Sequence, residues 1–202
     1  MGQKIHDIFG PGSNVNERVF RDYHLLRTRV LCLRGLGLKI VLTSGTFDLF
    51  HVGHSRYLEA ARALGDFLIV GVDSDEKVKK RKGPNRPIVP EDERLEIICH
   101  TRYPDAVFLK GANDDRWQLI KTIEPDVLVI SKSDREHDSG EIAELKKFAK
   151  EVIVLEPQAI TSTTAKIRKL LITPVDEVRR RLRAAFDSIE EVLDGFTKGG
   201  DA

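Results

Sequence analysis

Two histidines spaced three residues apart, His51 and His54, lie at the end of a run that also contains two glycines and an aspartate. The run, Thr43–His54, follows a short apolar segment and leads into a helical pattern. Residues three apart share one face of a helix, so both imidazoles can face one ligand. Two imidazole donors directed at one phosphate would stabilise the negative charge that develops on its oxygens during phosphoryl or nucleotidyl transfer.

The turn before this helix can hold phosphate oxygens through its backbone. Gly45 allows the chain to approach a ligand closely or to adopt positive φ, and Gly53 leaves room in the first helical turn. Ligands of open α/β sheets bind at the carboxyl ends of strands, and phosphates bind at helix N-termini. The turn therefore fits a ligand that contains phosphate.

Other interpretations of these residues have less support. A lone histidine is most often a surface or core residue, but here the two histidines share one turn with two glycines and an aspartate. A zinc site needs at least three protein ligands, and Asp48 is the one further candidate nearby in the sequence. The Walker pattern is absent, and Gly35-Leu36-Gly37 precedes a strand, so it is not a dinucleotide fingerprint. We expect no metal ligands in the protein itself.

The segments around this turn alternate between short apolar runs and helical patterns. Strands that are apolar on both faces and alternate with helices imply a parallel sheet covered on both sides. The expected fold is α/β and Rossmann-like, with a five-stranded parallel sheet and helices on both faces. The expected strands are Lys39–Thr43, Phe67–Val72, Ala106–Leu109, Val127–Ser131 and Val152–Leu155. The expected helices are Val52–Leu64, Pro90–Thr101, Arg116–Ile123, Gly140–Lys150 and Ser162–Leu171.

Both ends of the chain carry helical patterns outside this core. Apolar residues from Val19 to Leu33 are spaced three and four apart, after a capping pattern that starts at Asn14. A similar series begins at Thr173. These ends either pack on the core or form the seam of a homodimer. We divide the chain into an N-terminal helical extension (1–38), a central domain (39–172) and a C-terminal helix (173–202) that is a candidate oligomerisation element.

Composition narrows the class of protein. Hydrophobic residues make up 41% and charged residues 32% of the chain, which fits a globular domain and argues against wholesale disorder. The formal net charge is +1, so the general positive surplus that would bind nucleic acid or an anionic membrane is missing. Cys32 and Cys99 cannot build a disulfide framework. With no signal-peptide core at the N-terminus, we expect a cytoplasmic protein.

The run Thr43–His54 closely resembles the signature of the HxGH nucleotidyltransferase superfamily, in its cytidylyltransferase-like branch. That branch includes glycerol-3-phosphate cytidylyltransferases and the heptose-phosphate adenylyltransferase domain. The resemblance extends from about Lys39 to Leu171 and implies that the central domain is a nucleotidyltransferase. It implies transfer of AMP or CMP from a nucleoside triphosphate to a phosphorylated small molecule, a sugar or polyol phosphate, with release of pyrophosphate.

The resemblance also implies roles for individual residues. His51 and His54 would stabilise the α-phosphate, and Lys82, on a mobile lysine loop, would bridge donor and acceptor phosphates. Mg²⁺ is the expected cofactor, bound mainly by the triphosphate and water. Each of these roles has a structural alternative. The lysine loop could be a solvated basic loop, Arg94 could pair within its own helix, and Ser162–Thr164 could be an ordinary Ser/Thr N-cap. The implied nucleotide contacts are Ser44, Gly45, Thr46, Phe47, Asp48, Gly53, Lys79, Arg94, Ser162, Thr163 and Thr164.

Departures from the family pattern leave the substrate open. Pro157–Thr161 lacks the arginine that related cytidylyltransferases carry, and Ser131–Asp134 replaces their Gly-x-Asp-Trp stretch. The lysine segment, Lys82–Pro90, is closer to the heptose-phosphate adenylyltransferase domain, so AMP transfer is slightly preferred over CMP transfer. The alternative function is a catalytically silent, nucleotide-binding regulatory module. Nucleic-acid binding through Lys77–Lys82 is disfavoured by the near-zero net charge.

Overall fold

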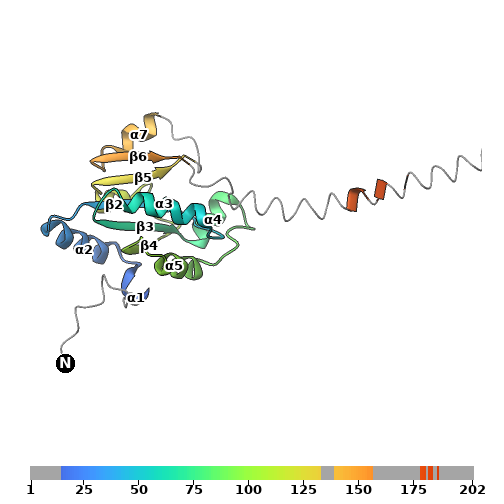
Figure 1. Ribbon diagram of the computed structural model, residues 1–202, viewed down its shortest axis with the longest axis horizontal. Helices are drawn as coiled ribbons and strands as arrows, with labels where there is room; N and C mark the ends of the chain where they lie inside the picture. The colour runs from blue at the N-terminus through green and yellow to red at the C-terminus, as the bar shows by residue number, and fades with distance from the viewer. Residues whose placement is uncertain (1–14, 133–138, 157–177, 181, 184–185, 187–202) are drawn as a thin grey trace, which may run out of the picture. The chain divides into compact units, whose positions relative to one another are not determined.

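The computed structural model describes residues 15–132, 139–156, 178–180, 182, 183 and 186. The chain forms two compact units, residues 1–160 and 161–202. All the described strands belong to the first unit (Figure 1). In the second unit the described residues are helical, and Val178, Leu182 and Phe186 each expose more than half of their surface. Within the described part of the chain, no helix has the length and apolar character that crossing a membrane requires.

A six-stranded parallel sheet with the strand order β1-β4-β3-β2-β5-β6 forms the centre of the first unit (Figure 1). The strands are β1 (Val19–Phe20), β2 (Ile40–Gly45), β3 (Phe67–Asp73), β4 (Ala106–Lys110), β5 (Val127–Ser131) and β6 (Glu151–Leu155). The predicted α/β fold with a parallel sheet is confirmed, and each of the five predicted strands is present. The predicted strand count was too low by one, because β1 adds an edge strand that pairs with β4.

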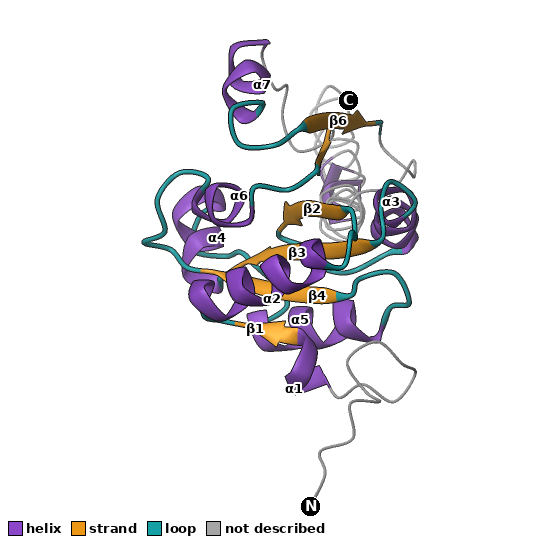
Figure 2. Cartoon of the chain, turned by 90° about the vertical axis from the view of Figure 1, so that its left-hand side faces the viewer, coloured by secondary structure: helices purple, strands orange, loops and turns teal. Residues whose placement is uncertain are grey.

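Helices cover both faces of this sheet, and Figure 2 shows α3 and α6 on opposite sides of the strands. Neighbouring residues of a strand point to opposite faces. Leu42 of β2 accordingly packs with α2 and α6, whereas Val41 packs with α3 and α5. Burying one such side chain contributes about 1.5–3 kcal/mol. The helices are α1 (Val15–Arg18), α2 (Tyr23–Gly35), α3 (Val52–Arg62), α4 (Asp75–Lys82), α5 (Glu91–His100), α6 (Gln118–Ile123) and α7 (Ser139–Leu145).

The N-terminal segment differs from the single helix expected from Asn14 onwards. Helix α1 ends at Arg18, and the guanidinium of this residue donates to backbone carbonyls that precede β4. The following residues, Val19–Phe20, are extended and pair with β4. A second helix then begins after Asp22, whose carboxylate accepts a hydrogen bond from Leu25 N at 2.7 Å. The apolar spacing was compatible with one helix. The structure has two helices instead, because Val19–Phe20 pair with β4 and Asp22 caps a new helix.

The apolar residues of α2 face the sheet and α6 within the first unit. Leu26, Val30 and Leu33 are buried in the core beneath the sheet. Of the two alternatives for the N-terminal segment, packing on the core is therefore confirmed, and a dimer seam formed by these residues is not. Most of the C-terminal series that begins at Thr173 lies outside the described residues.

Lys79 and Lys82 lie in a helix, whereas a mobile loop was expected there. Residues Asp75–Lys82 form helix α4, and the Ser74 hydroxyl caps it by accepting from Lys77 N at 3.2 Å. Acidic residues occupy its first turn and basic residues its last turn, which suits the helix dipole. The helix ends at Gly83, which has φ +93°, a conformation that favours glycine. The loop therefore begins only after Lys82.

Candidate active site

The predicted motif lies where the winding of the sheet reverses. From the central strand β2 the chain continues to β3 and β4 on one side, and then to β5 and β6 on the other. Open α/β sheets bind ligands at this switch point, outside the carboxyl ends of the strands. Strand β2 ends at Gly45 and the motif follows directly. The sheet therefore positions the motif at the place where a ligand is expected.

The two motif histidines form the N-terminal cap of α3. Gly53 N donates to His51 Nδ1 at 3.0 Å, and His51 N donates to His54 Nδ1 at 3.3 Å. The rings are stacked, with centroids 3.9 Å apart. Because each Nδ1 accepts a hydrogen bond, the neutral rings carry their protons on Nε2. In this tautomer each histidine has an Nε2–H group that can donate a hydrogen bond to a phosphate oxygen.

The turn between β2 and α3 has a strained backbone. Phe47 and Leu49 have φ values of 54° and 47°, a left-handed conformation that is costly for bulky residues. The ring of Phe47 packs under Gly45, where a Cβ atom would lie only 3.2 Å from Phe47 Cε2. Strained residues of this kind concentrate at functional sites. A side chain at position 45 would therefore have to displace the Phe47 ring slightly.

Asp48 links the motif turn to the loop that follows α4. Its side chain is 2% exposed and accepts hydrogen bonds from Ile88 N at 3.0 Å and Val89 N at 3.0 Å. It also forms an ion pair with Arg86 at 3.0 Å. These contacts give Asp48 a positioning role within the protein. The direct nucleotide contact implied by the family resemblance stays a prediction.

Arg94 has a similar internal role. Its side chain is completely buried. The guanidinium donates to Thr46 O at 2.6 Å, Val89 O at 2.9 Å and Asp75 Oδ1 at 2.7 Å. Arg94 thereby joins the motif turn, the loop before α5 and the start of α4. The nucleotide contact that the family resemblance implies for Arg94 stays a prediction.

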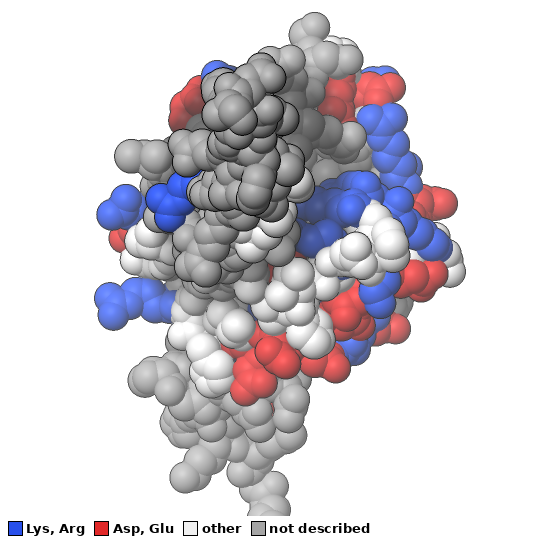
Figure 3. All heavy atoms as spheres, turned by 90° about the vertical axis from the view of Figure 1, so that its right-hand side faces the viewer, with Lys and Arg blue, Asp and Glu red and all other residues white. Residues whose placement is uncertain are grey.

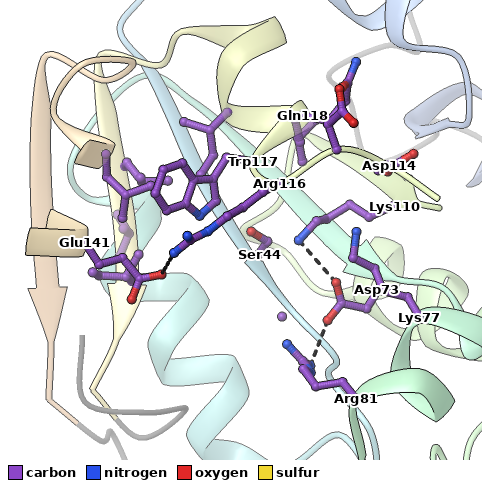
Figure 4. Close-up of a pocket in the computed structure, with 18 of the residues that line it drawn as sticks. Ser44, Asp73, Lys77, Arg81, Lys110, Asp114, Arg116, Trp117, Gln118 and Glu141 are labelled. Carbon is purple, nitrogen blue, oxygen red and sulfur yellow. Dashed lines mark hydrogen bonds and ion pairs between the residues drawn. The ribbon is translucent and has the colours of Figure 1, made fainter. Parts of the chain in front are cut away.

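A cavity of about 440 Å³ opens beside the motif, between α4, α6 and the carboxyl ends of β2, β3 and β5 (Figure 4). Ser44 and Gly45 line it, which places it next to the motif turn. Lys and Arg side chains gather around a hollow on this side of the molecule (Figure 3). Gly71 packs against lining residues, because a Cβ atom there would come within 2.6 Å of Leu119 Cδ2 and 2.9 Å of Lys110 Cδ.

One wall of the cavity holds three cations around a buried carboxylate. Asp73, which is 2% exposed, pairs with Arg81 at 2.9 Å and with Lys110 at 3.2 Å. Lys77 Nζ lies nearby and donates to Gly111 O at 3.0 Å. Burial alone would raise the pKa of Asp73, but Lys110 and Arg81 outweigh it and the pKa is lowered. Burial and then Lys110 lower the pKa of Lys77.

The lysines singled out from the sequence lie elsewhere on the same helix. Lys77 and Arg81 are four residues apart and share one face of α4, which lines the cavity. Lys79 and Lys82 are exposed and are not among the lining residues. Their roles as phosphate contacts stay predictions. Ser162, Thr163 and Thr164 lie outside the described residues.

Sequence reasoning missed most of the cationic wall. One signal was available: Ser74 followed by two acidic residues is a helix-start pattern, and it would have placed Lys77 and Arg81 on one face. Lys110 and Asp73 end their strands, and only the register between β3 and β4 brings them together. Among the described residues, no group of three His, Cys, Asp or Glu side chains could hold a metal ion.

Comparisons with known proteins agree with this geometry. The model of the cytidylyltransferase-like family matches residues 42–174. The bifunctional protein HldE of Methylobacillus flagellatus is 39% identical over 145 residues, which cover 72% of this chain and 30% of HldE. HldE of Helicobacter pylori strain P12 is 41% identical over 138 residues, which cover 68% of this chain and 29% of HldE. The chain thus spans less than a third of the length of these relatives.

Solved structures share the fold. The lipopolysaccharide core biosynthesis protein from Thermoplasma volcanium superposes with a TM-score of 0.51 and 28% identity, over 60% of this chain and 97% of that protein. Pantoate-beta-alanine ligase from Francisella tularensis superposes with a TM-score of 0.52 over 68% of this chain and 66% of the ligase, but at 14% identity the likeness concerns the fold alone. Since the family model covers more than half of its residues, the chain belongs to the cytidylyltransferase-like family of nucleotidyltransferases.

Proposed function

We propose that the protein transfers a nucleoside monophosphate from a nucleoside triphosphate to a sugar or polyol phosphate and releases pyrophosphate. The observation that carries the proposal is the position of His51 and His54, which cap α3 at the switch point beside a cavity with a cationic wall. The family match supports the reaction type, and the resemblance of the lysine segment to the heptose-phosphate adenylyltransferase domain favours AMP transfer.

The reaction needs no covalent intermediate. An oxygen of the acceptor phosphate attacks the α-phosphorus in line, a new P–O bond forms, and the bond to the bridging oxygen breaks. Pyrophosphate leaves with the electron pair. A phosphate dianion is already a nucleophile, so catalysis consists of positioning and of neutralising charge. The Nε2–H groups of His51 and His54 would donate to the α-phosphate oxygens as their charge grows.

Mg²⁺ belongs to the same proposal. With no cluster of three metal-ligating side chains among the described residues, the ion would enter with the triphosphate and keep several waters. Asp48 and Asp73 are held in ion pairs, which fits this arrangement better than a protein cage. When bound, Mg²⁺ would neutralise part of the triphosphate charge.

The test is an assay of pyrophosphate release with ATP, CTP, GTP and UTP against a panel of sugar and polyol phosphates. We expect release with ATP, or with CTP, only when an acceptor is present. Nucleotide binding without release would instead favour the silent regulatory module. That alternative draws its support from the exposed apolar side chains of the second unit, Val178, Leu182 and Phe186, which would suit a protein partner.

We also propose a homodimer formed through the C-terminal segment and a cytoplasmic location, where nucleoside triphosphates are available. The N-terminal seam is buried in the core, so the segment after Thr173 is the one of the two predicted seams that this proposal uses. Removal of residues 175–202 should lower the mass measured by light scattering from dimer to monomer. An unchanged mass would contradict the dimer.

A further inference from the structure

The charged and polar residues that line the cavity form two chemical groups. The cationic wall consists of Lys77, Arg81 and Lys110 around Asp73, so this group by itself carries a formal charge of +2. Figure 4 shows that Lys110 reaches Asp73 from β4 and Arg81 reaches it from α4, with Lys77 beside them. A phosphomonoester carries about two negative charges near pH 7. A phosphomonoester would bind at this local group of cations; Arg116, Asp114, Asp115 and Glu141 bring the formal charge of the whole lining to zero.

The second group suits hydroxyl groups and a carbon skeleton, and its Asp114 lies beside Lys110 (Figure 4). Asp114 and Asp115 offer carboxylate oxygens, which accept hydrogen bonds from hydroxyls. Tyr23 donates to Asp114 Oδ2 at 2.5 Å, and burial together with Asp114 raises the pKa of this phenol, so it stays a donor. The Trp117 indole provides an apolar face, and Arg116 covers one side of it at 4.2 Å.

Trp117 adopts a conformation that indicates a functional role for this second group. Its φ of 64° is left-handed, which is costly for a bulky aromatic residue. Its ring contacts the Arg116 guanidinium and lies 6.5 Å, between centroids, from the ring of Phe148. Backbone strain that the surrounding structure maintains is concentrated at ligand sites. The strain thus provides an observation independent of the charge pattern.

We propose that this cavity is the acceptor site, in which Lys77, Arg81 and Lys110 bind the acceptor phosphate while Asp114, Tyr23 and Trp117 bind a polyhydroxylated carbon skeleton. The inference rests on the proposed function. It assigns the acceptor phosphate to residues other than Lys79 and Lys82. Asp73 is a positioning residue, because its buried carboxylate holds Arg81 and Lys110 in place.

The position of the cavity suits an in-line reaction. Ser44 and Gly45 line it and begin the motif turn, whereas His51 and His54 are not among its lining residues. Arg81 also donates to Thr46 Oγ1 at 2.7 Å, so the cationic wall touches the turn itself. A phosphate held here would approach the α-phosphorus from beside the turn, and the histidines would remain for the nucleotide.

The first experiment separates the two substrates by their KM values. In Lys110→Gln we expect the acceptor KM to rise about 10- to 100-fold, because a hydrogen bond between charged groups is lost. The KM for the nucleoside triphosphate should stay within about twofold of wild type. Lys80→Gln is the control, since Lys80 is an exposed lysine of α4 that pairs with Glu76 and is not among the lining residues. A raised nucleotide KM with an unchanged acceptor KM would overturn the assignment.

The second experiment needs no turnover. Binding of inorganic phosphate and of a hexose 1-phosphate is measured by calorimetry, without nucleotide, on wild type, Lys110→Gln and Asp114→Asn. We expect Lys110→Gln to weaken both ligands about 10-fold and Asp114→Asn to weaken only the sugar phosphate. Failure of both ligands to bind wild type, or equal binding by all three proteins, would contradict the proposal.

Together the experiments distinguish the two levels of inference. Suppose that sugar-phosphate binding depends on Lys110 but the protein releases no pyrophosphate. The acceptor site would then be supported and the proposed function contradicted. If the enzyme turns over and the acceptor KM is the same in Lys110→Gln and wild type, the proposed function is supported and the proposed acceptor site is contradicted.

Discussion

The carboxylate of Asp48 and the guanidinium of Arg86 form an ion pair of 3.0 Å between the motif turn and the loop after the lysine helix. The same carboxylate accepts hydrogen bonds from Ile88 N and Val89 N. The two segments that carry most of the predicted chemistry are therefore fastened to each other through one buried aspartate. A change at Asp48 should disturb both segments together.

Asp48→Asn should reduce the free energy of unfolding by about 3 kcal/mol, because removing one partner of a buried ion pair leaves the other charge uncompensated. Turnover should fall as well. Urea unfolding followed by circular dichroism measures the first effect. The control is Asp92→Asn, which breaks an exposed pair with Arg21 and should change stability by no more than about 1 kcal/mol. Equal effects of the two variants would show that the Asp48 contacts are not stabilising.

Substitutions at His54 should separate capping from chemistry. His54→Asn can keep an acceptor near Nδ1, so stability should hold while turnover falls about 100-fold through loss of the Nε2 donor. His54→Gln places a donor near Nε2 and should retain more activity but lose part of the cap, at about 1 kcal/mol. Steady-state kinetics and thermal unfolding of both variants test this. Wild-type turnover in His54→Asn would mean that the histidine is structural.

Arg94→Lys should reduce the free energy of unfolding by about 3 kcal/mol, because one ammonium cannot serve three acceptors on separate segments and buried acceptors lose their partners. Arg29→Lys, at an exposed position on α2, is the matched control and should be neutral. Chemical denaturation measures both. If Arg94→Lys kept its stability and raised only the nucleotide KM, the residue would contact the nucleotide after all.

The lowered pKa of Lys77 predicts weaker acceptor binding at alkaline pH. Burial and Lys110, with Arg81, disfavour its charged form, whereas Asp73 and Asp114 favour it. Lys77 therefore loses its proton below the ordinary lysine pKa of about 10.4, and the acceptor KM should rise as the pH is raised from about 8 to 10. Lys77→Arg, which stays charged, should flatten this rise. An identical profile in the two proteins would remove Lys77 from the acceptor site.

Much of the fold could be predicted because the strands are buried on both faces and are read as short apolar runs. The run Phe67–Val72, for example, lies within a strand that is buried throughout. The edge strand β1 could not be predicted, since Val19 and Phe20 also fit a helical spacing. Only the contact with Val107 and Phe108 makes them extended.

The site was predictable where its residues are neighbours in sequence and unpredictable where the fold assembles it. His51 and His54 share one turn, so their spacing identified them. Asp73 and Lys110 meet through the register of two strands, which the sequence does not encode locally. The internal role of Arg94 could not be predicted for a related reason: its three hydrogen-bond partners come from distant segments, and burial of a guanidinium cannot be read from composition.

The hydrogen bond from Tyr23 to Asp114 joins the cavity to a segment that precedes the family match, which begins at residue 42. A chain cut back to that boundary would keep the histidine motif but lose a side chain of the cavity wall. Chimeras that exchange residues 15–35 between homologous enzymes would therefore retune acceptor choice while leaving the reaction chemistry intact. The N-terminal segment is thus a place where evolution could change what the enzyme accepts without altering how it reacts.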